Sequence, residues 1–322
     1  MGPSVSVIVP AYQAAGTIGR TVRSCLSQAL QDLEVVVADN LSDDGTELAA
    51  RAVAAGDPRV VFIRQEQRLS VNAALNLCIA KARGRFLLFA PAHDILAPDC
   101  LGTLQGALEG DGGLSYAFGG FLFVGPSSSE ARLQARPSYR RSGRKELVRL
   151  AAGGLTEACV TLMRMDAVRE VGGFDEGLRR TNHWDLVSRL CLVGDVRYFR
   201  RVLGQYVFTG KHCSWREEIE ERITLLDRHA AYFERAGIRA THMAKLREQL
   251  AWDLEHGLAY PDARDLSVSD RRTLAQMALG STVAGRDRRW VGRASVRRFG
   301  ARSKACVRAA VARSLTSLLR RA

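Results

Sequence analysis

A carboxylate and an imidazole stand next to each other after a short apolar run, Phe86–Phe89. They are His93 and Asp94, and Pro98 follows them closely. Together these two side chains can bind a divalent cation and, through it, a phosphate. An imidazole suits Mn²⁺ better than Mg²⁺, which prefers oxygen ligands. The alternative is that Asp94 caps the following turn and His93 is a surface residue.

A second reactive group, His183-Trp184-Asp185, lies further along the chain. An imidazole with an ordinary pKa can remove a proton from a hydroxyl group near neutral pH. Residues two apart do not share a helix face, so both His183 and Asp185 can face one substrate only if the helix starts after His183. We therefore predict His183 as a general base at a loop-to-helix junction. Asp185 is the alternative base. Otherwise it orients His183, or it stabilises the helix N-terminus with its negative charge.

Elements that can position these residues are visible in the first hundred residues. Apolar runs without polar alternation predict strands buried on both faces. Helix-like stretches between them imply βαβ units and a parallel sheet. Ser42–Asp44 and Ser70 are expected to cap helices that run to Ala54 and Arg83. The predicted strands are Val5–Val9, Leu33–Ala38, Val60–Ile63 and Phe86–Phe89.

Beyond Asp99 the pattern is weaker. We expect a polar loop at Arg136–Lys145, a strand at Cys159–Met163 and a helix at Trp184–Val193. Glu217–Leu279 is predicted to be helical, and its apolar residues on one face are Ile223, Leu225, Leu226, Ala230 and Phe233. The expected domains are 1–215, a helical extension at 216–280 and a basic tail at 281–322.

Composition narrows the class of protein. The chain has 322 residues, of which 47% are hydrophobic, and no apolar run reaches the roughly 18 residues that span a bilayer. Seven scattered cysteines, none in a CxxC pair, argue against a disulfide framework or zinc site and favour the reducing cytoplasm.

The charge is concentrated near the C-terminus. Residues 286–321 contain eleven arginines, one lysine and one aspartate, so they carry +11 of the net +13. Interleaved apolar residues there predict an amphipathic helix on an anionic membrane surface, at the inner face of the membrane. The alternative is a helix that packs on the rest of the chain with a solvated basic face. Nucleic-acid binding is disfavoured because Trp290 and Phe299 are the only aromatic residues in this stretch.

Four segments together resemble the family 2 inverting glycosyltransferases, which have the GT-A fold. The resemblance covers roughly residues 4–200. It implies an α/β, mostly parallel, doubly wound sheet with a C-terminal helical extension. It also implies transfer of a sugar from a nucleotide-sugar, foremost a UDP-sugar, to a hydroxyl acceptor in glycan, glycolipid or natural-product biosynthesis. The segments are SVSVIVPAYQAAGTIGRTVRSCLSQ, EVVVADNLSDDGT, SVNAALNLCIAKARGRFLLFAPAHDILAPDCL and GGFDEGLRRTNHWDLVSRLCLVGDVRYF.

The resemblance implies a nucleotide pocket. Tyr12 would stack on the base or ribose, although an ordinary strand-exit turn is the alternative. Asp39 would accept the N–H of the uracil ring, because an ionised carboxylate only accepts hydrogen bonds. Where the family has a second acid, this chain has Asn40. The nucleotide-binding candidates are Pro10, Ala11, Tyr12, Asp39, Arg68, Asn72 and Ala92.

The metal and acceptor sites depart from the family pattern. Pro91 and His93 stand at the two positions of its Asp-Xaa-Asp motif, and Asp94 matches a further Asp. His212, in a His-Xaa-Ser element, is the third candidate ligand for Mn²⁺ or Mg²⁺. His183 stands where the family has the Asp that deprotonates the acceptor hydroxyl. Trp184 would give the acceptor an apolar platform. These departures leave open a catalytically degenerate nucleotide-sugar-binding or scaffold protein.

Overall fold

The computed structural model describes residues 2–125, 131–151, 158–179, 181–208, 215–238, 247–248, 251 and 268–279. The described residues up to Ala278 belong to one compact unit. The predicted basic tail at 281–322 lies outside the described residues.

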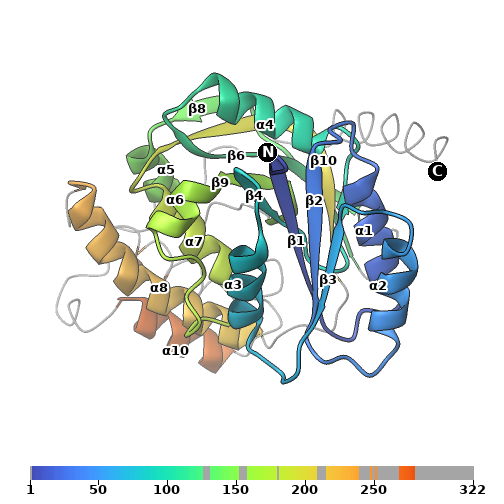
Figure 1. Ribbon diagram of the computed structural model, residues 1–322. Helices are drawn as coiled ribbons and strands as arrows, with labels where there is room; N and C mark the ends of the chain where they lie inside the picture. Colours follow the sequence, from blue (N-terminus) through green and yellow to red (C-terminus); the bar gives the residue numbers. More distant parts are fainter. Residues whose placement is uncertain are drawn as a thin grey trace. The chain divides into compact units, whose positions relative to one another are not determined.

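The N-terminal strands pair in parallel in the order β3-β2-β1-β4 (Figure 1). Most apolar side chains of β1, β2 and β4 are buried, as expected for strands covered on both faces, whereas those of the edge strand β3 are half-buried. All four coincide with predicted strands, and β1–β3 run one or two residues further. The bounds are β1 (Val5–Ala11), β2 (Leu33–Asp39), β3 (Val60–Arg64) and β4 (Phe86–Phe89).

Helices cover both faces of this sheet. α1 (Ile18–Leu26), α2 (Thr46–Ala54) and α4 (Cys100–Gly110) pack on one apolar cluster, and α3 (Val71–Lys81) packs on the other (Figure 1). Ser70 caps α3 as predicted, because its Oγ accepts the Ala73 N–H at 3.1 Å.

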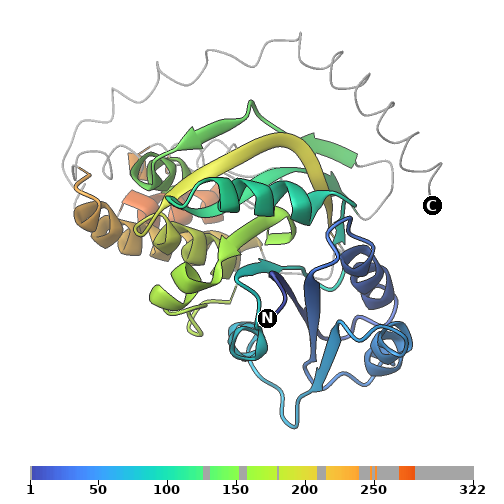
Figure 2. The same cartoon turned by 45° about the horizontal axis from the view of Figure 1, so that its top comes forward.

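The remaining strands make the sheet mixed rather than parallel throughout. β9 pairs antiparallel with both β4 and β6, while β10 runs parallel to β6 with register shifts and is long and bent (Figure 2). The bounds are β5 (Ile95–Leu96), β6 (Leu114–Val124), β7 (Ala131–Gln134), β8 (Tyr139–Arg141), β9 (Thr161–Arg164) and β10 (Asp195–Val207).

The later helices pack on the α3 side. The loop predicted at Arg136–Lys145 is wrong, because β8 pairs with β10 there and α5 begins at Gly143. None of the described helices is long and apolar enough to cross a membrane. The bounds are α5 (Gly143–Ala151), a 3₁₀ turn (Ala158–Val160), α6 (Met165–Glu170), α7 (Asn182–Leu190), α8 (Trp215–Arg235) and α10 (Val268–Leu279).

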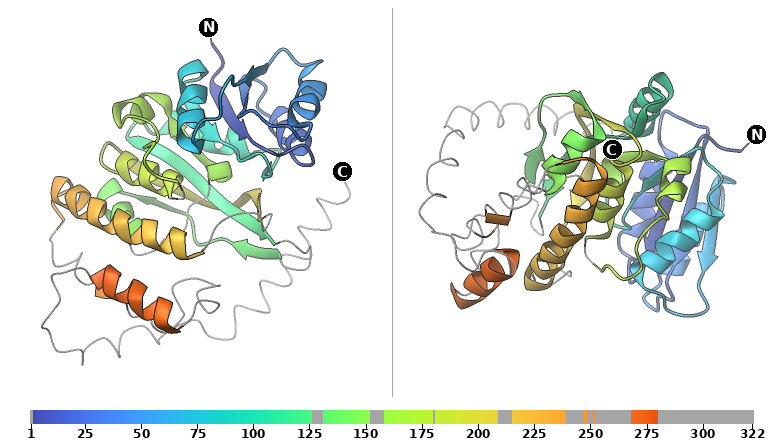
Figure 3. Two further views of the ribbon diagram at one scale, coloured as in Figure 1. Left: turned by 90° about the horizontal axis from the view of Figure 1, so that it is seen from below. Right: turned by 90° about the vertical axis from the view of Figure 1, so that its left-hand side faces the viewer.

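α8 lies beside α7, and α10 lies beyond α8 (Figure 3). The apolar face predicted for α8 is partly wrong: Ala230 is exposed, and His229 beside it is buried. The His229 Nε2 lies 2.9 Å from the Ser188 Oγ on α7, so this face binds its neighbour through polar as well as apolar side chains.

Candidate active site

Asp39 lies at the carboxyl edge of the parallel strands, where ligands bind in open α/β sheets. Ala11, Asp39 and Arg64 are register partners at the ends of β1, β2 and β3. Asp39 is fully buried, and its Oδ2 accepts a hydrogen bond of 2.9 Å from the Arg64 Nη1. Arg64 also binds Glu47. Sequence reasoning missed Arg64, although its place at a strand end was a usable signal.

Tyr12 and Arg68 stack at the same edge. Tyr12 is 41% exposed, and the Arg68 guanidinium carbon lies 4.0 Å from the centre of its ring. This distance is typical of a cation–π contact. Arg68 is itself exposed, so moving its side chain off the ring would uncover no core residue. Of the other predicted pocket residues, Pro10 is half-buried, and Ala11 and Ala92 are buried.

Asn40 anchors the loop that carries Arg68. Its Oδ1 accepts the Leu69 N–H at 2.8 Å, and its Nδ2 donates to the Leu69 carbonyl at 2.9 Å. The next residue, Leu41, has φ of 61°, a left-handed conformation that is strained for a branched side chain.

Asn72 lies away from the strand-end edge. Its side chain is fully buried, and its Nδ2 donates to the carbonyls of Asp175 and Leu178 at 2.5 and 2.7 Å. Its Oδ1 accepts from the Asn182 Nδ2 at 2.7 Å. These bonds fix α3 against the segment before α7.

His93 and Asp94 follow β4. The His93 Nε2 lies 3.8 Å from the Asp94 Oδ1, which also accepts the Val207 N–H at 2.9 Å. Burial raises the pKa of Asp94 to about 7, partly offset by the Val207 N–H and the Cys159 thiol. The buried Asp94 Oδ2 has no hydrogen-bond partner among the described residues. An orphaned carboxylate oxygen beside an imidazole fits a cation, although no described cluster reaches three ligands. His212 lies outside the described residues.

The turn before α7 is built as the motif predicts. Gly172 and Gly173 have φ of 84° and 68°, which glycine adopts without strain. Asn76 on α3 binds Phe174 in the turn twice, through its Oδ1 to the N–H and its Nδ2 to the carbonyl, both at 2.9 Å. The turn is therefore fixed to α3.

His183 is not at a loop-to-helix junction, because α7 begins at Asn182. The imidazole is 8% exposed, and neither ring nitrogen has a hydrogen-bond partner among the residues that the structure describes. Burial lowers the pKa of His183 to about 4, so the expectation of an ordinary pKa is wrong. The ring is neutral at pH 7 and can accept a proton, but it is a weaker base than an exposed imidazole.

Asp185 points to α8, away from His183. Its Oδ2 binds the Arg189 Nη2 at 2.6 Å, and its Oδ1 accepts the Tyr232 hydroxyl at 3.0 Å. Arg228 on α8 lies 3.9 Å from the same Oδ1. Asp185 is fully buried and Arg189 is 15% exposed, whereas Arg228 is 36% exposed, so the Arg189 pair is the better shielded from water. The two candidate bases therefore occupy different faces of α7, as their spacing requires.

Trp184 packs partly buried against the core, and its ring is edge-on to that of His229 at a centroid distance of 6.4 Å. This contact joins α7 to α8. The residues of α8 that contact α7 carry no sequence motif, and the prediction did not include them.

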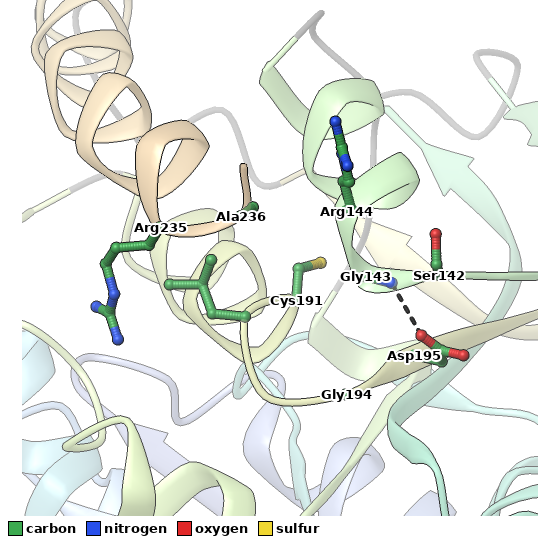
Figure 4. Close-up of a pocket in the computed structure, with 9 residues that line it drawn as sticks. Ser142, Gly143, Arg144, Cys191, Gly194, Asp195, Arg235 and Ala236 are labelled. Atoms are coloured by element: carbon green, nitrogen blue, oxygen red, sulfur yellow. Dashed lines mark hydrogen bonds between the residues drawn. The ribbon is translucent and has the colours of Figure 1, made fainter. Parts of the chain in front are cut away.

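A hollow of about 380 Å³ lies elsewhere, lined by Gly143, Arg144, Cys191, Asp195 and Arg235 among others. Figure 4 shows the Gly143 N–H bound to Asp195, with the Arg144 and Arg235 side chains pointing in different directions. Asp195 begins β10, whereas β10 reaches Asp94 only at its other end, Val207. This hollow is therefore separate from the strand-end edge.

The sequence is similar to those of known glycosyltransferases. Residues 6–172 match the model of glycosyl transferase family 2. Chondroitin synthase of Escherichia coli is 26% identical over 220 residues, which are 66% of this chain and 30% of that protein. The chain spans less than two thirds of the length of the curated relatives it matches, and about a third for most of them.

Two solved structures share the fold. S. aureus TarS 1–349 in complex with UDP-GlcNAc has a TM-score of 0.62 at 17% identity, over 85% of this chain and 79% of that one. The mannosyltransferase PcManGT from Pyrobaculum calidifontis, in complex with GDP-Man and Mn²⁺, has a TM-score of 0.56 at 20% identity, over the same shares. The predicted GT-A fold is confirmed, and with more than half of its residues matched to the family model the chain belongs to glycosyl transferase family 2.

Proposed function

We propose that the protein is an inverting glycosyltransferase that moves a sugar from a UDP-sugar to a hydroxyl acceptor in glycan, glycolipid or natural-product biosynthesis. The observation that carries this proposal is the strand-end edge. A stacking ring, a buried carboxylate and a His-Asp pair follow β1, β2 and β4 inside the family domain.

The donor side binds the uracil ring of the UDP-sugar. Asp39 is held by Arg64 and by the Ser42 N–H, and a remaining lone pair of its carboxylate would accept the imide N–H of uracil. Tyr12 offers a partly exposed ring on which the base stacks once Arg68 moves aside. Asn72 is a positioning residue here, since its amide is engaged with backbone carbonyls.

His93 and Asp94 are the described residues that would hold Mn²⁺, or less favourably Mg²⁺, with His212 as a further candidate ligand. A bound cation would neutralise charge on the departing diphosphate. The free Asp94 Oδ2 supports this assignment.

The acceptor side supplies the general base that removes the proton of the acceptor hydroxyl. The acceptor oxygen bonds to the anomeric carbon as the bond from that carbon to the diphosphate oxygen breaks. The hydroxyl proton passes to a ring nitrogen of His183, and UDP leaves. Trp184 lies next to His183 in the sequence and is the proposed apolar contact for the acceptor.

Titration calorimetry with UDP, GDP and CDP, each with Mn²⁺ or EDTA, tests the donor assignment. We expect UDP to bind more tightly than CDP, and Mn²⁺ to tighten the complex. Incubation with UDP-GlcNAc and Mn²⁺ then tests catalysis through slow release of UDP. Binding without release would favour the non-catalytic nucleotide-sugar-binding alternative, and no binding of any nucleotide would overturn the proposal.

We further propose that residues 286–321 bind an anionic membrane surface, because they hold +11 of the net charge. Sedimentation with phosphatidylserine vesicles should carry down the full chain more than a 1–283 truncation, and less so at high salt. Equal sedimentation of both chains would contradict this role.

A further inference from the structure

Four polar side chains of α8 form a stripe that faces α7 and the turn before it. Glu221, Arg228, His229 and Tyr232 are spaced so that they share one face of the helix. Arg228 binds Asp175 in the turn, and His229 and Tyr232 bind Ser188 and Asp185 on α7. The fourth, Glu221, contacts the segment that leads into His183.

The contact of Glu221 is with main-chain donors. Its Oε1 accepts the Arg179 N–H at 2.7 Å, and its Oε2 accepts the Thr181 N–H at 2.6 Å. The Thr181 hydroxyl donates to the same Oε2 at 3.0 Å. Thr181 is the N-cap residue of α7, yet its side chain does not cap the helix. One carboxylate from α8 therefore fixes the backbone at which α7 starts, two residues before His183.

We propose that Glu221 is a positioning residue for the transfer reaction. It acts by holding the first turn of α7, and with it the His183 imidazole, in one orientation. This inference rests on the proposed function for its catalytic part only. It also makes α8 part of the active-site frame, although α8 lies beyond the residues matched to the family model.

The chemistry of the contact makes Glu221→Gln a sharp test. A glutamine has one carbonyl oxygen, so its NH₂ group would face a backbone N–H and at least one bond would be lost. Glu221→Asp keeps two acceptor oxygens and should therefore retain part of the kcat that Glu221→Gln loses. Glu234→Gln, an exposed residue of the same helix, is the matched control.

The first measurement is UDP release from UDP-GlcNAc with Mn²⁺, alongside UDP affinity and thermal unfolding. For Glu221→Gln we expect kcat to fall by about 10- to 100-fold, as displaced catalytic groups do. The KM for UDP-GlcNAc and the Kd for UDP should change less than about twofold, since β1, β2 and β4 carry that site. A parallel loss of UDP affinity, kcat and melting temperature would show a merely structural role and overturn the proposal, as would a kcat equal to that of Glu234→Gln.

The second measurement needs no substrate. Carbethoxylation of His183 by diethyl pyrocarbonate, followed by mass spectrometry, reports how well the ring is held and shielded. Labelling should be faster in Glu221→Gln than in the parent and in Glu234→Gln. Deuterium exchange should rise in 178–186 and not in α3. Unchanged labelling and exchange in Glu221→Gln would overturn the inference. If labelling is faster in Glu221→Gln but the parent protein itself releases no UDP, Glu221 positions His183 and the proposed function is rejected.

Discussion

The donor-side edge and the acceptor-side helix hold their charged groups in different ways. At the edge, buried Asp39 is paired with an arginine that is 36% exposed, and Tyr12 is covered by the exposed Arg68. On α7, buried Asp185 is paired with Arg189, whose side chain is only 15% exposed, and with residues of α8. The donor side is thus bounded by exposed arginines, whereas the acceptor side is packed against a second helix. Mutations at the edge should change binding, and mutations on α7 should change turnover or folding.

The largest effect is expected at His183. His183→Ala should lower turnover by roughly 10²–10⁴-fold, because it removes the proposed general base. UDP affinity should stay unchanged, since the imidazole lies on the acceptor side. Single-turnover kinetics with UDP-GlcNAc measure this. An active His183→Ala beside an inactive but folded Asp185→Asn would transfer the role of base to the carboxylate.

Asp185→Asn should mainly destabilise the fold. It leaves the largely buried Arg189 guanidinium without its charged partner, with only the Val171 carbonyl still accepting from its Nη1, and the loss of a buried charged partner typically costs about 3–5 kcal/mol of unfolding free energy. Urea unfolding monitored by circular dichroism measures the loss. Asp175→Asn is the matched control: its partner Arg228 and Asp175 itself are each 36% exposed, so we expect about 0–1 kcal/mol. Equal losses in the two variants would remove the contrast between the buried and the exposed pair.

Asp39→Ala should weaken UDP binding by about 1.5–3 kcal/mol, the range for a hydrogen bond to a charged group. Calorimetry against the neighbouring Asp43→Ala, an exposed acid, measures the difference. If both variants bind UDP as tightly as the parent does, Asp39 does not bind the uracil ring.

The last effect, similar in size to that of Asp39→Ala, concerns the pH dependence of stability. The pKa of His183 is about 4 in the folded chain because of burial and about 6.5 when unfolded. The unfolded state therefore binds more protons between these values, so stability falls as pH drops through this window. Between pH 7.5 and pH 5 the loss should be about 2 kcal/mol. Urea titrations of the parent and of His183→Gln at both pH values should differ by this amount, and parallel curves would contradict the burial of a neutral ring.

The strand ends were predictable because the strands at β1–β4 are apolar without alternation, and parallel strands align their carboxyl ends. That rule predicts where Asp39, Tyr12 and the His93–Asp94 pair lie, whereas the roles of Asp39 and Tyr12 toward a nucleotide come from the family resemblance. The orientation of α7 was not predictable. Whether His183 or Asp185 faces α8 depends on which side of α7 is covered, and no local signal specifies that. Nor does Glu221 differ in sequence from its neighbour Glu220, since only tertiary packing brings it to Thr181.

Two asparagines perform the same task on the two sides of the molecule. Asn40 binds both backbone groups of Leu69 near the donor edge, and Asn76 binds both backbone groups of Phe174 in the acceptor turn. A carboxylate can replace neither, because it accepts but does not donate. At position 40 the family pattern has an acid. Asn40 therefore holds the loop that carries Arg68 without adding a second negative charge beside Asp39. Asn40→Asp would add that charge and remove the Nδ2 donor in one step, so the Leu69 carbonyl would lose its partner.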